Sequence, residues 1–311
     1  TTLTGCSAAL STPTNTTSES VYAITDVAVI DVENGIAVPG QTVIVVDDRI
    51  DKIGVQGKVE IPKGAVIING HGLYLMPGLV DAHVHYFDAP VFGRLMIANG
   101  VLLVRDMGMP NEYILPLRDE LNQGKTLGPE MVASGAMLDG VPPVIPTISM
   151  GLTTPEQGRT AVQAQVKAGV DTIKVYSNLD QAVFLAIVDE ARKSGIKVVG
   201  HIPDTVYIED AAAAGLDSIE HWFGFQKAIA KLLGEPVNLE HGWMSSGADY
   251  LSRLGEVDPQ ALQDFYRGLQ ENGVTVDPTV VTFKNWPNVD ALELQSMPHG
   301  EYISQELFSL W

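Results

Sequence analysis

The sequence predicts an α/β protein, a TIM-type (β/α)8 barrel preceded by a small β unit. Long Ala-rich stretches alternate with short β-branched runs, a glycine stands before each run, and the cycle yields seven strands. This alternation is expected of a parallel sheet whose strands are joined by helical crossovers. A doubly wound open sheet is the alternative, but no GxGxxG turn follows the first strand to support a nucleotide crevice.

The first 20 residues have the character of an export signal remnant and a tether. Leu3-Thr4-Gly5-Cys6 resembles a bacterial lipobox, in which the cysteine is acylated, and the polar run STPTNTTSES follows it. We therefore expect an exported protein, periplasmic or at the cell surface, with a lipid anchor on Cys6. The alternative is a chance cysteine in a start rich in small residues.

Residues 21–72 form the predicted small β unit, and residues 73–311 form the barrel. The runs VAVIDV, TVIVVDDRIDKIG and AVIIN alternate with turn signals at Asp47-Asp48 and Gly57. In the barrel, each strand after the first begins just beyond a glycine that suits the left-handed end of the preceding helix. These glycines are Gly100, Gly128, Gly169, Gly195, Gly215 and Gly273, and the first strand begins at Gly78.

Reactive side chains recur at one position, the C-terminal end of each predicted strand. They are His83, His85, Arg105, Ser134, Lys174, His201 and His221. Barrel enzymes build their active sites at this end, where the βα loops leave a concave face. The other histidines, His71, His241 and His299, do not follow the rule, so we expect them in turns or on the surface.

The spacing of His83 and His85 indicates a shared metal ion, because residues i and i+2 of a strand project from the same side. With His201 and His221 they supply four imidazoles for a divalent transition metal, of which zinc is the most common choice. An unmodified Lys174 would repel such a cation because an ammonium has no acceptor. Lys174 therefore either points elsewhere or is modified.

Composition sets further limits. The chain has 311 residues, 45% of them apolar, and 38 acidic against 19 basic groups, giving a net charge of −19. Such a charge repels phosphate backbones, so nucleic acid is not expected as a partner. A single cysteine excludes an intrachain disulfide.

From about residue 21 to residue 311 the chain resembles the amidohydrolase superfamily, in the branch related to imidazolonepropionase that includes Xaa-Pro dipeptidases. The motifs that carry the resemblance are PGLVDAHVH, GVLLVRDMG, AGVDTIKVY, VVGHIPD and AGLDSIEHWFG. The resemblance implies two divalent metal ions, with zinc expected, bridged by a carboxylated Lys174. By position, His83 and His85 would bind the more buried ion, and His201 and His221 the second.

The family pattern also includes an aspartate at the end of strand eight, which takes and returns the proton. After GVTVDPTVV we find neither an eighth strand nor this aspartate, so the catalytic residue is left unassigned and the barrel is expected to lack strand eight. Asp277 is a conceivable substitute, but the family geometry puts it on the wrong strand, strand seven. The small β-sandwich that the resemblance implies would likewise be incomplete, and we expect a chain truncated as a gene fragment or clipped product.

The predicted function is hydrolysis of an amide or peptide-like C–N bond by a metal-activated hydroxide. The substrate would be a small molecule such as a dipeptide, an N-acyl amino acid or a cyclic amide. Tyr176, Ser177 and Arg105 are candidates for holding it, and Arg105 has the alternative of an ion pair with Asp106 or a neighbouring loop. Residues 225–268, with the apolar side chains Trp222, Phe223, Trp243 and Met244, would supply either a lid or core.

Two rival functions remain open. One is a metal-binding surface lipoprotein that binds a ligand without turnover. The other is an inactive fragment that forms homo-oligomers through the open edge between the first and seventh strands, where backbone groups would seek partners.

Overall fold

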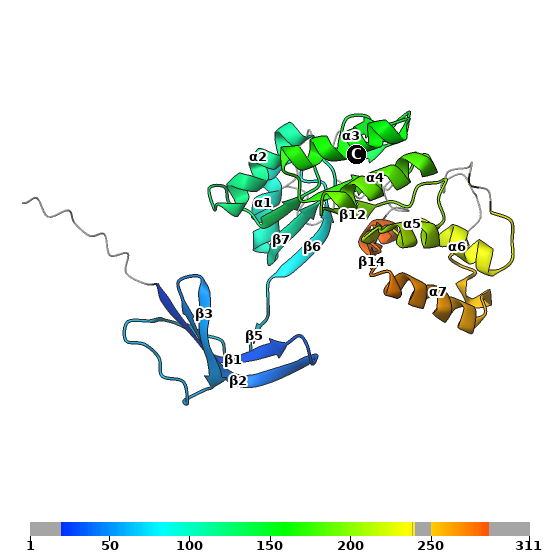
Figure 1. Ribbon diagram of the computed structural model, residues 1–311. Coiled ribbons are helices and arrows are strands. Elements are labelled where there is room, and N and C mark those ends of the chain that lie inside the picture. The colour runs from blue at the N-terminus through cyan, green and yellow to red at the C-terminus, as the bar shows by residue number, and fades with distance from the viewer. Residues whose placement is uncertain (1–19, 238, 240–249, 286–311) are drawn as a thin grey trace, which may run out of the picture. The chain divides into compact units, whose positions relative to one another are not determined.

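The computed structural model describes residues 20–237, 239 and 250–285 (Figure 1). The chain divides into two compact units, Thr1–Pro77 and Gly78–Trp311. Cys6, nearly all of the predicted tether and residues 286–311 lie outside the described residues. No helix in the described ranges is both long and apolar enough to cross a bilayer.

The first unit contains a five-stranded sheet. Strands β1 (Val21–Asp31), β2 (Ile36–Val46) and β3 (Arg49–Val55) are antiparallel, and β4 (Val66–Asn69) and β5 (Tyr74–Leu75) pair in parallel with β1. Val46 pairs with Arg49, which leaves Asp47 and Asp48 as the predicted two-residue turn, with φ +52° at Asp47. Within residues 20–77 this is the one sheet seen, so the second layer of a sandwich stays a prediction.

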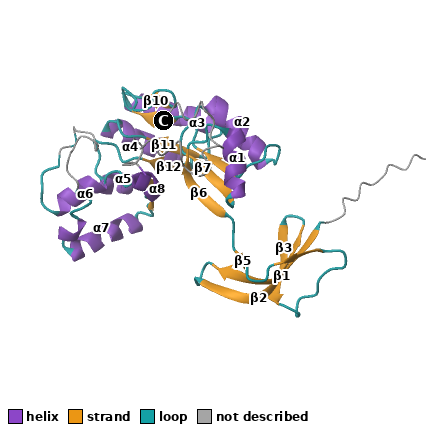
Figure 2. Ribbon diagram, turned by 180° about the vertical axis from the view of Figure 1, so that it is seen from behind, coloured by secondary structure: helices purple, strands orange, loops and turns teal. Residues whose placement is uncertain are grey.

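Strands and helices alternate through the second unit, as predicted (Figure 2). The seven predicted strands are β6 (Leu79–Val84), β7 (Val101–Asp106), β8 (Glu130–Ala133), β11 (Thr172–Val175), β12 (Lys197–Gly200), β13 (Ser218–Glu220) and β14 (Thr275–Asp277). Two short strands, β9 (Met137–Asp139) and β10 (Ser149–Gly151), were not predicted. The helices are α1 (Ala89–Ala98), α2 (Asn111–Asn122), α3 (Pro155–Ala168), α4 (Gln181–Lys193), α5 (Ile208–Ala214), α6 (Phe225–Leu232), α7 (Pro259–Glu271) and α8 (Val280–Asn285), with a 3₁₀ turn at Leu254–Glu256.

The strands of this unit are parallel and form two ladders, β6-β7-β8 and β10-β9-β11-β12-β13-β14. Asp171 joins them, because its amide donates to the Ala133 carbonyl at 2.8 Å and its carboxylate accepts from the Ala133 amide at 2.9 Å. The main strands thus follow chain order, whereas a doubly wound sheet reverses its order at a switch point. No ladder joins β14 to β6 in the described residues, so closure of the barrel remains a prediction.

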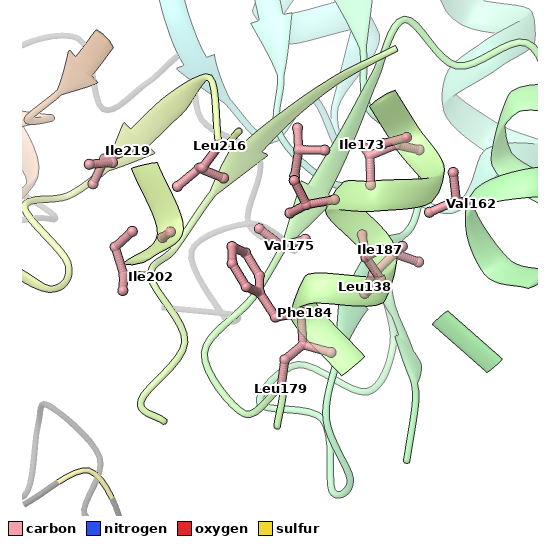
Figure 3. Packing of buried hydrophobic residues seen from close by; sticks show 14 of the residues in the cluster. Leu138, Val162, Ile173, Val175, Leu179, Phe184, Ile187, Ile202, Leu216 and Ile219 are labelled. Carbon is pink, nitrogen blue, oxygen red and sulfur yellow. The ribbon is translucent and has the colours of Figure 1, made fainter. Parts of the chain in front are cut away.

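Helix α4 covers the middle of the parallel strands of the second unit. Phe184 and Ile187 on α4 share a fully buried cluster with Ile173 and Val175 of β11 (Figure 3). Because the apolar side of β11 packs on the helix, its alternate residues face the other side of the sheet. Lys174 lies between these two apolar residues and therefore points away from α4.

Local signals explain where the helices begin and end. Thr154 and Gln157 cap α3 reciprocally, and Gly169 ends it with φ +87°. Positive φ is also found at the predicted positions Gly100, Gly195, Gly215 and Gly273. The prediction is wrong for Gly128. Gly124 takes the left-handed conformation after α2, and Gly128 instead packs tightly against Leu121.

Candidate metal centre

Four histidines come together at the C-terminal ends of three strands. His83 lies in β6 and His85 follows it directly, while His201 and His221 are the first residues after β12 and β13. The ring centre of His83 lies 5.6 Å from that of His85 and 4.2 Å from that of His221. The rings of His201 and His221 are 5.1 Å apart. Residues from three separate strands thus form one cluster.

In two of these rings, the hydrogen-bond partner of Nδ1 shows which nitrogen carries the hydrogen. Nδ1 of His83 lies 2.8 Å from Oε2 of Glu220, and Nδ1 of His85 lies 2.9 Å from the carbonyl oxygen of Gly108. A carboxylate and a carbonyl only accept hydrogen bonds, so in both rings Nδ1 donates. Nε2 of each neutral ring then carries a lone pair.

The other two rings use the same nitrogen. Nδ1 of His201 lies 2.9 Å from the Ser177 hydroxyl, and Nδ1 of His221 lies 2.6 Å from the Thr279 hydroxyl. Nε2 of His83 and of His201 is buried and has no hydrogen-bond partner. Native proteins rarely leave such atoms unpaired unless an ion or water completes them. In all four rings, therefore, Nε2 is the nitrogen left for a metal.

The charge state of the rings suits metal binding. Burial lowers the pKa of all four imidazoles, to about 3 for His221 and well below the usual range for His201. The positive charge of Lys174 lowers these values further. The imidazoles are therefore neutral at pH 7, which is the form that binds zinc.

Lys174 is the third residue of β11 and is completely buried, and its Nζ has no hydrogen-bond partner. Burial lowers the pKa of this amine from 10.5 to about 7, with Glu220 opposing the shift and Arg105 adding to it. A large share of the lysine is thus uncharged at neutral pH. The electrostatic objection to a lysine beside cations applies only to its charged form.

The stability of the metal-free chain should depend on pH through Lys174. Between about pH 7 and pH 10.5 the unfolded lysine holds a proton that the folded one lacks, so the free energy of unfolding rises with pH in this window. We expect Lys174→Met to stabilise the metal-free chain more at about pH 6 than at about pH 9. Denaturation followed by tryptophan fluorescence measures this, since all four tryptophans lie in Gly78–Trp311. A stability gain equal at both pH values would contradict it.

Gly200 makes room for the lysine. Its φ is +137°, and a Cβ at this position would lie 2.2 Å from the Val175 carbonyl oxygen and 3.1 Å from Cδ of Lys174. Any other residue would collide with β11 and with the lysine stem. The glycine before His201 is therefore part of the site's construction.

Glu220 is a functional residue that the sequence analysis did not single out. Its carboxylate is fully buried and accepts from Nδ1 of His83, from Nη2 of Arg105 at 2.9 Å and from the Ser218 hydroxyl at 2.7 Å. The signal was present in the run DSIEH, since a buried strand carries a carboxylate only where partners compensate it.

The ligand atoms of His83, Glu220 and Asp277 lie within 4.8 Å of one another, which would suit a cation. However, Nη2 of Arg105 lies 2.9 Å from Glu220 and 3.7 Å from Asp277. The guanidinium therefore already supplies a cation to both carboxylates. This side of His83 is therefore an ion-pair network, and its Nε2 side has no hydrogen-bond partner.

Backbone strain surrounds one of the four histidines. His221, Trp222 and Thr279 all have positive φ, +59°, +61° and +43°. This conformation is uncommon for residues other than glycine and is an outlier for a β-branched threonine. Each such residue costs on the order of 1–3 kcal/mol and tends to persist at functional sites. Here the strain places the His221 ring against the Thr279 hydroxyl.

The three predicted substrate residues lie next to the cluster, and each has a protein partner. The Tyr176 ring packs on His201, with ring centres 3.9 Å apart, and Ser177 holds Nδ1 of that histidine. Arg105 pairs with Glu220 and with a backbone carbonyl, at Ala82, rather than with Asp106. Their contact with a substrate stays a prediction.

A cavity of about 860 Å³ adjoins the cluster between β6, β7 and β14. Its polar lining includes His83, Arg105, Asp277 and Thr279, and valines and leucines supply most of its apolar lining. Beside it, Phe223 packs on His201 with ring centres 3.9 Å apart. His71 is exposed in a turn of the first unit, as predicted, whereas His241, His299, Trp243 and Met244 lie outside the described residues.

The Amidohydrolase family model matches residues 74–275, more than half of the chain. Among curated proteins, the adenine deaminase of Methanosarcina barkeri is 24% identical over 242 residues, which cover 70% of this chain and 42% of the relative. The chain thus spans about two fifths of the length of that relative.

Solved structures show the same fold. A putative prolidase from Bifidobacterium longum is similar with a TM-score of 0.58 and 24% identity, covering 89% of this chain and 78% of that one. A bottromycin amidohydrolase is similar with a TM-score of 0.62 and 22% identity, covering 91% and 58%. Together with the strand-end histidines and the parallel α/β architecture, the family match shows that this chain belongs to the amidohydrolase family.

Proposed function

We propose that the protein is a metal-dependent hydrolase of amide or peptide-like C–N bonds. The observation that carries this proposal is the cluster of four neutral imidazoles around a buried, partly uncharged lysine. Each ring has its Nδ1 held by a protein partner, and Nε2 of His83 and of His201 is buried without a partner. Such donors fit a divalent transition metal, most commonly zinc. Similarity to a putative prolidase and to an adenine deaminase supports hydrolysis of C–N bonds as the reaction class.

Five residues would hold the metal. His83 and His85 would bind one ion and His201 and His221 a second, with Lys174 between them as a carbamate. The neutral Lys174 amine would form this group by bonding to the carbon of carbon dioxide and releasing one proton. The lowered pKa of Lys174 supports this step, because only the uncharged amine has a lone pair to attack with.

When bound, two divalent cations lower the pKa of a bound water molecule to about 7 and polarise a substrate carbonyl. The protein's own contribution is to hold the ligands in place. Ser177 and Thr279 fix the rings of His201 and His221, and Phe223 and Tyr176 shield His201 from solvent. The aspartate that the resemblance implies for moving the proton stays unassigned, because the described residues contain no barrel strand after β14.

We propose a dipeptide-like substrate, with N-acyl amino acids and cyclic amides as the other members of the class. The test is to incubate the full 311-residue chain with zinc and bicarbonate and a panel of Xaa-Pro dipeptides, other dipeptides, N-acyl amino acids, a cyclic amide and adenine. We expect amino-acid release from a dipeptide, loss of that release with a chelator, and recovery when zinc is returned.

The matched control for this assay is His71→Ala, which removes an exposed histidine outside the cluster and should leave turnover unchanged. Release of ammonia from adenine alone would replace the dipeptide proposal with a deaminase. Stoichiometric zinc with no turnover on any substrate would favour the binding function instead.

A further inference from the structure

We propose that Glu220 sets the tautomer of His83, and that Arg105 in turn fixes which terminal atom of the side chain at position 220 faces His83. Both are positioning residues, since neither would touch the metal. The inference rests on the proposed function for the role of His83 as a ligand. It concerns the hydrogen-bond network behind that ligand.

The two oxygens of the Glu220 carboxylate have different partners. Oε2 lies 2.8 Å from Nδ1 of His83, whereas Oε1 accepts from Arg105 at 2.9 Å and from Ser218 at 2.7 Å. The side chains of His83 and Glu220 are 6% and 0% exposed. The Glu220 carboxylate is therefore shielded from water.

This arrangement determines where the imidazole carries its hydrogen. Because a carboxylate oxygen can only accept, Nδ1 of His83 must be the donor, and Nε2 is left with a lone pair facing the other ligands. A hydrogen on Nε2 would block that nitrogen as a ligand. Hydrogen-bond partners of metal-binding histidines act in this way in general.

Arg105 allows only one orientation of the side-chain group at position 220. Its Nε donates to the Ala82 carbonyl at 2.6 Å, which ties the guanidinium to β6, and its Nη2 faces Oε1. A guanidinium has donors only, so the atom that faces it must be an acceptor. Ser218 can face either a donor or an acceptor, because a hydroxyl can donate or accept.

The consequence is specific for Glu220→Gln, which keeps the shape of the side chain. The amide oxygen is required opposite Arg105, so the amide NH₂ must face Nδ1 of His83. The NH₂ can only donate, which makes Nδ1 the acceptor and moves the hydrogen to Nε2. The isosteric change should therefore invert the tautomer and weaken metal binding.

Replacing Arg105 should restore the original tautomer of His83, because no guanidinium would then require an acceptor opposite it. In the double variant Glu220→Gln/Arg105→Met the amide is free to turn, with its oxygen toward His83 and its NH₂ toward Ser218. The variant also removes both members of the Glu220–Arg105 ion pair, so neither of these two charges is left without the other. A role in packing alone predicts no recovery, because the double variant lacks both original partners. A role in charge balance alone predicts recovery of zinc affinity but leaves the hydrogen on Nδ1 of His83 in Glu220→Gln, so the tautomer separates it from the proposal.

The experiment uses the full chain with histidines labelled by nitrogen-15. Long-range proton–nitrogen spectra of the chelator-treated protein report the tautomer of His83, assigned with His83→Gln, and competition with a chelating dye gives the affinity for zinc. We expect hydrogen on Nδ1 in the wild type, on Nε2 in Glu220→Gln, and on Nδ1 again in the double variant. Zinc affinity should fall by roughly 10–100-fold in Glu220→Gln and recover at least partly in the double variant.

Two results would overturn the inference. One is an unchanged Nδ1 hydrogen in Glu220→Gln, and the other is a double variant that binds zinc no better than the single one. If Glu220→Gln does not fold, the wild-type spectrum still decides, since hydrogen on Nε2 of His83 there refutes the assignment. A wild type that binds no zinc would refute the proposed function, and the tautomer readout would stay valid without metal.

Discussion

Lys174→Met should reduce bound zinc from about two equivalents per chain to one or none, and lower turnover by roughly 10³-fold or more. The lysine is buried among the four histidines with no hydrogen-bond partner, so its terminal group can serve the cluster and little else. Methionine fills much of the same volume but offers no oxygen after exposure to carbon dioxide. Elemental analysis of the dialysed protein and the dipeptide assay measure the two effects.

The matched control is Lys125→Met, which removes an exposed lysine and should leave metal content unchanged. A second check is to withhold bicarbonate from the wild type during zinc loading. Metal content should then approach that of Lys174→Met, because the carbamate cannot form. Two full equivalents of zinc in Lys174→Met would refute the bridging role of the lysine.

Gly200→Ala should destabilise the second unit by about 4 kcal/mol and reduce zinc binding. Two costs combine at this position. The backbone has φ +137°, which side chains rarely adopt, and the new Cβ would lie 2.2 Å from the Val175 carbonyl oxygen. Relief requires β11 and β12 to separate, which would displace Lys174 and His201 from the cluster. Urea unfolding followed by tryptophan fluorescence gives the stability.

Gly169→Ala separates these two costs. Gly169 also has positive φ, +87°, but a Cβ there would meet no atom within 4 Å. We expect a loss of about 1 kcal/mol from backbone strain alone and no change in zinc binding. If both alanine variants lose the same stability, the collision at Gly200 is not what keeps this position glycine.

The strands and the four histidines were predictable because both signals are local. A glycine at a helix end followed by a β-branched run identifies a buried strand, and position at the strand end places a side chain at one rim. The short strands β9 and β10 escaped prediction because three residues amid prolines give no clear period. Gly128 followed the pattern in sequence but is required for close packing against Leu121.

The hydrogen bonds behind the ligands were not predictable from sequence. Glu220 acquires its role from partners on β6 and β7, and the Gly108 carbonyl and Thr279 hydroxyl are set by loop conformation. Arg105 shows the same limit. Its place at a strand end suggested a substrate contact, but only the fold reveals that a buried carboxylate from β13 lies opposite it.

Anomalous diffraction from crystals of the zinc-loaded protein, grown with bicarbonate, tests the central claim most directly. The prediction is two zinc peaks among His83, His85, Lys174, His201 and His221, each contacting Nε2 of its histidines, with density for a carboxyl group on the lysine. Zinc peaks elsewhere, or rings that meet the metal through Nδ1, would contradict it.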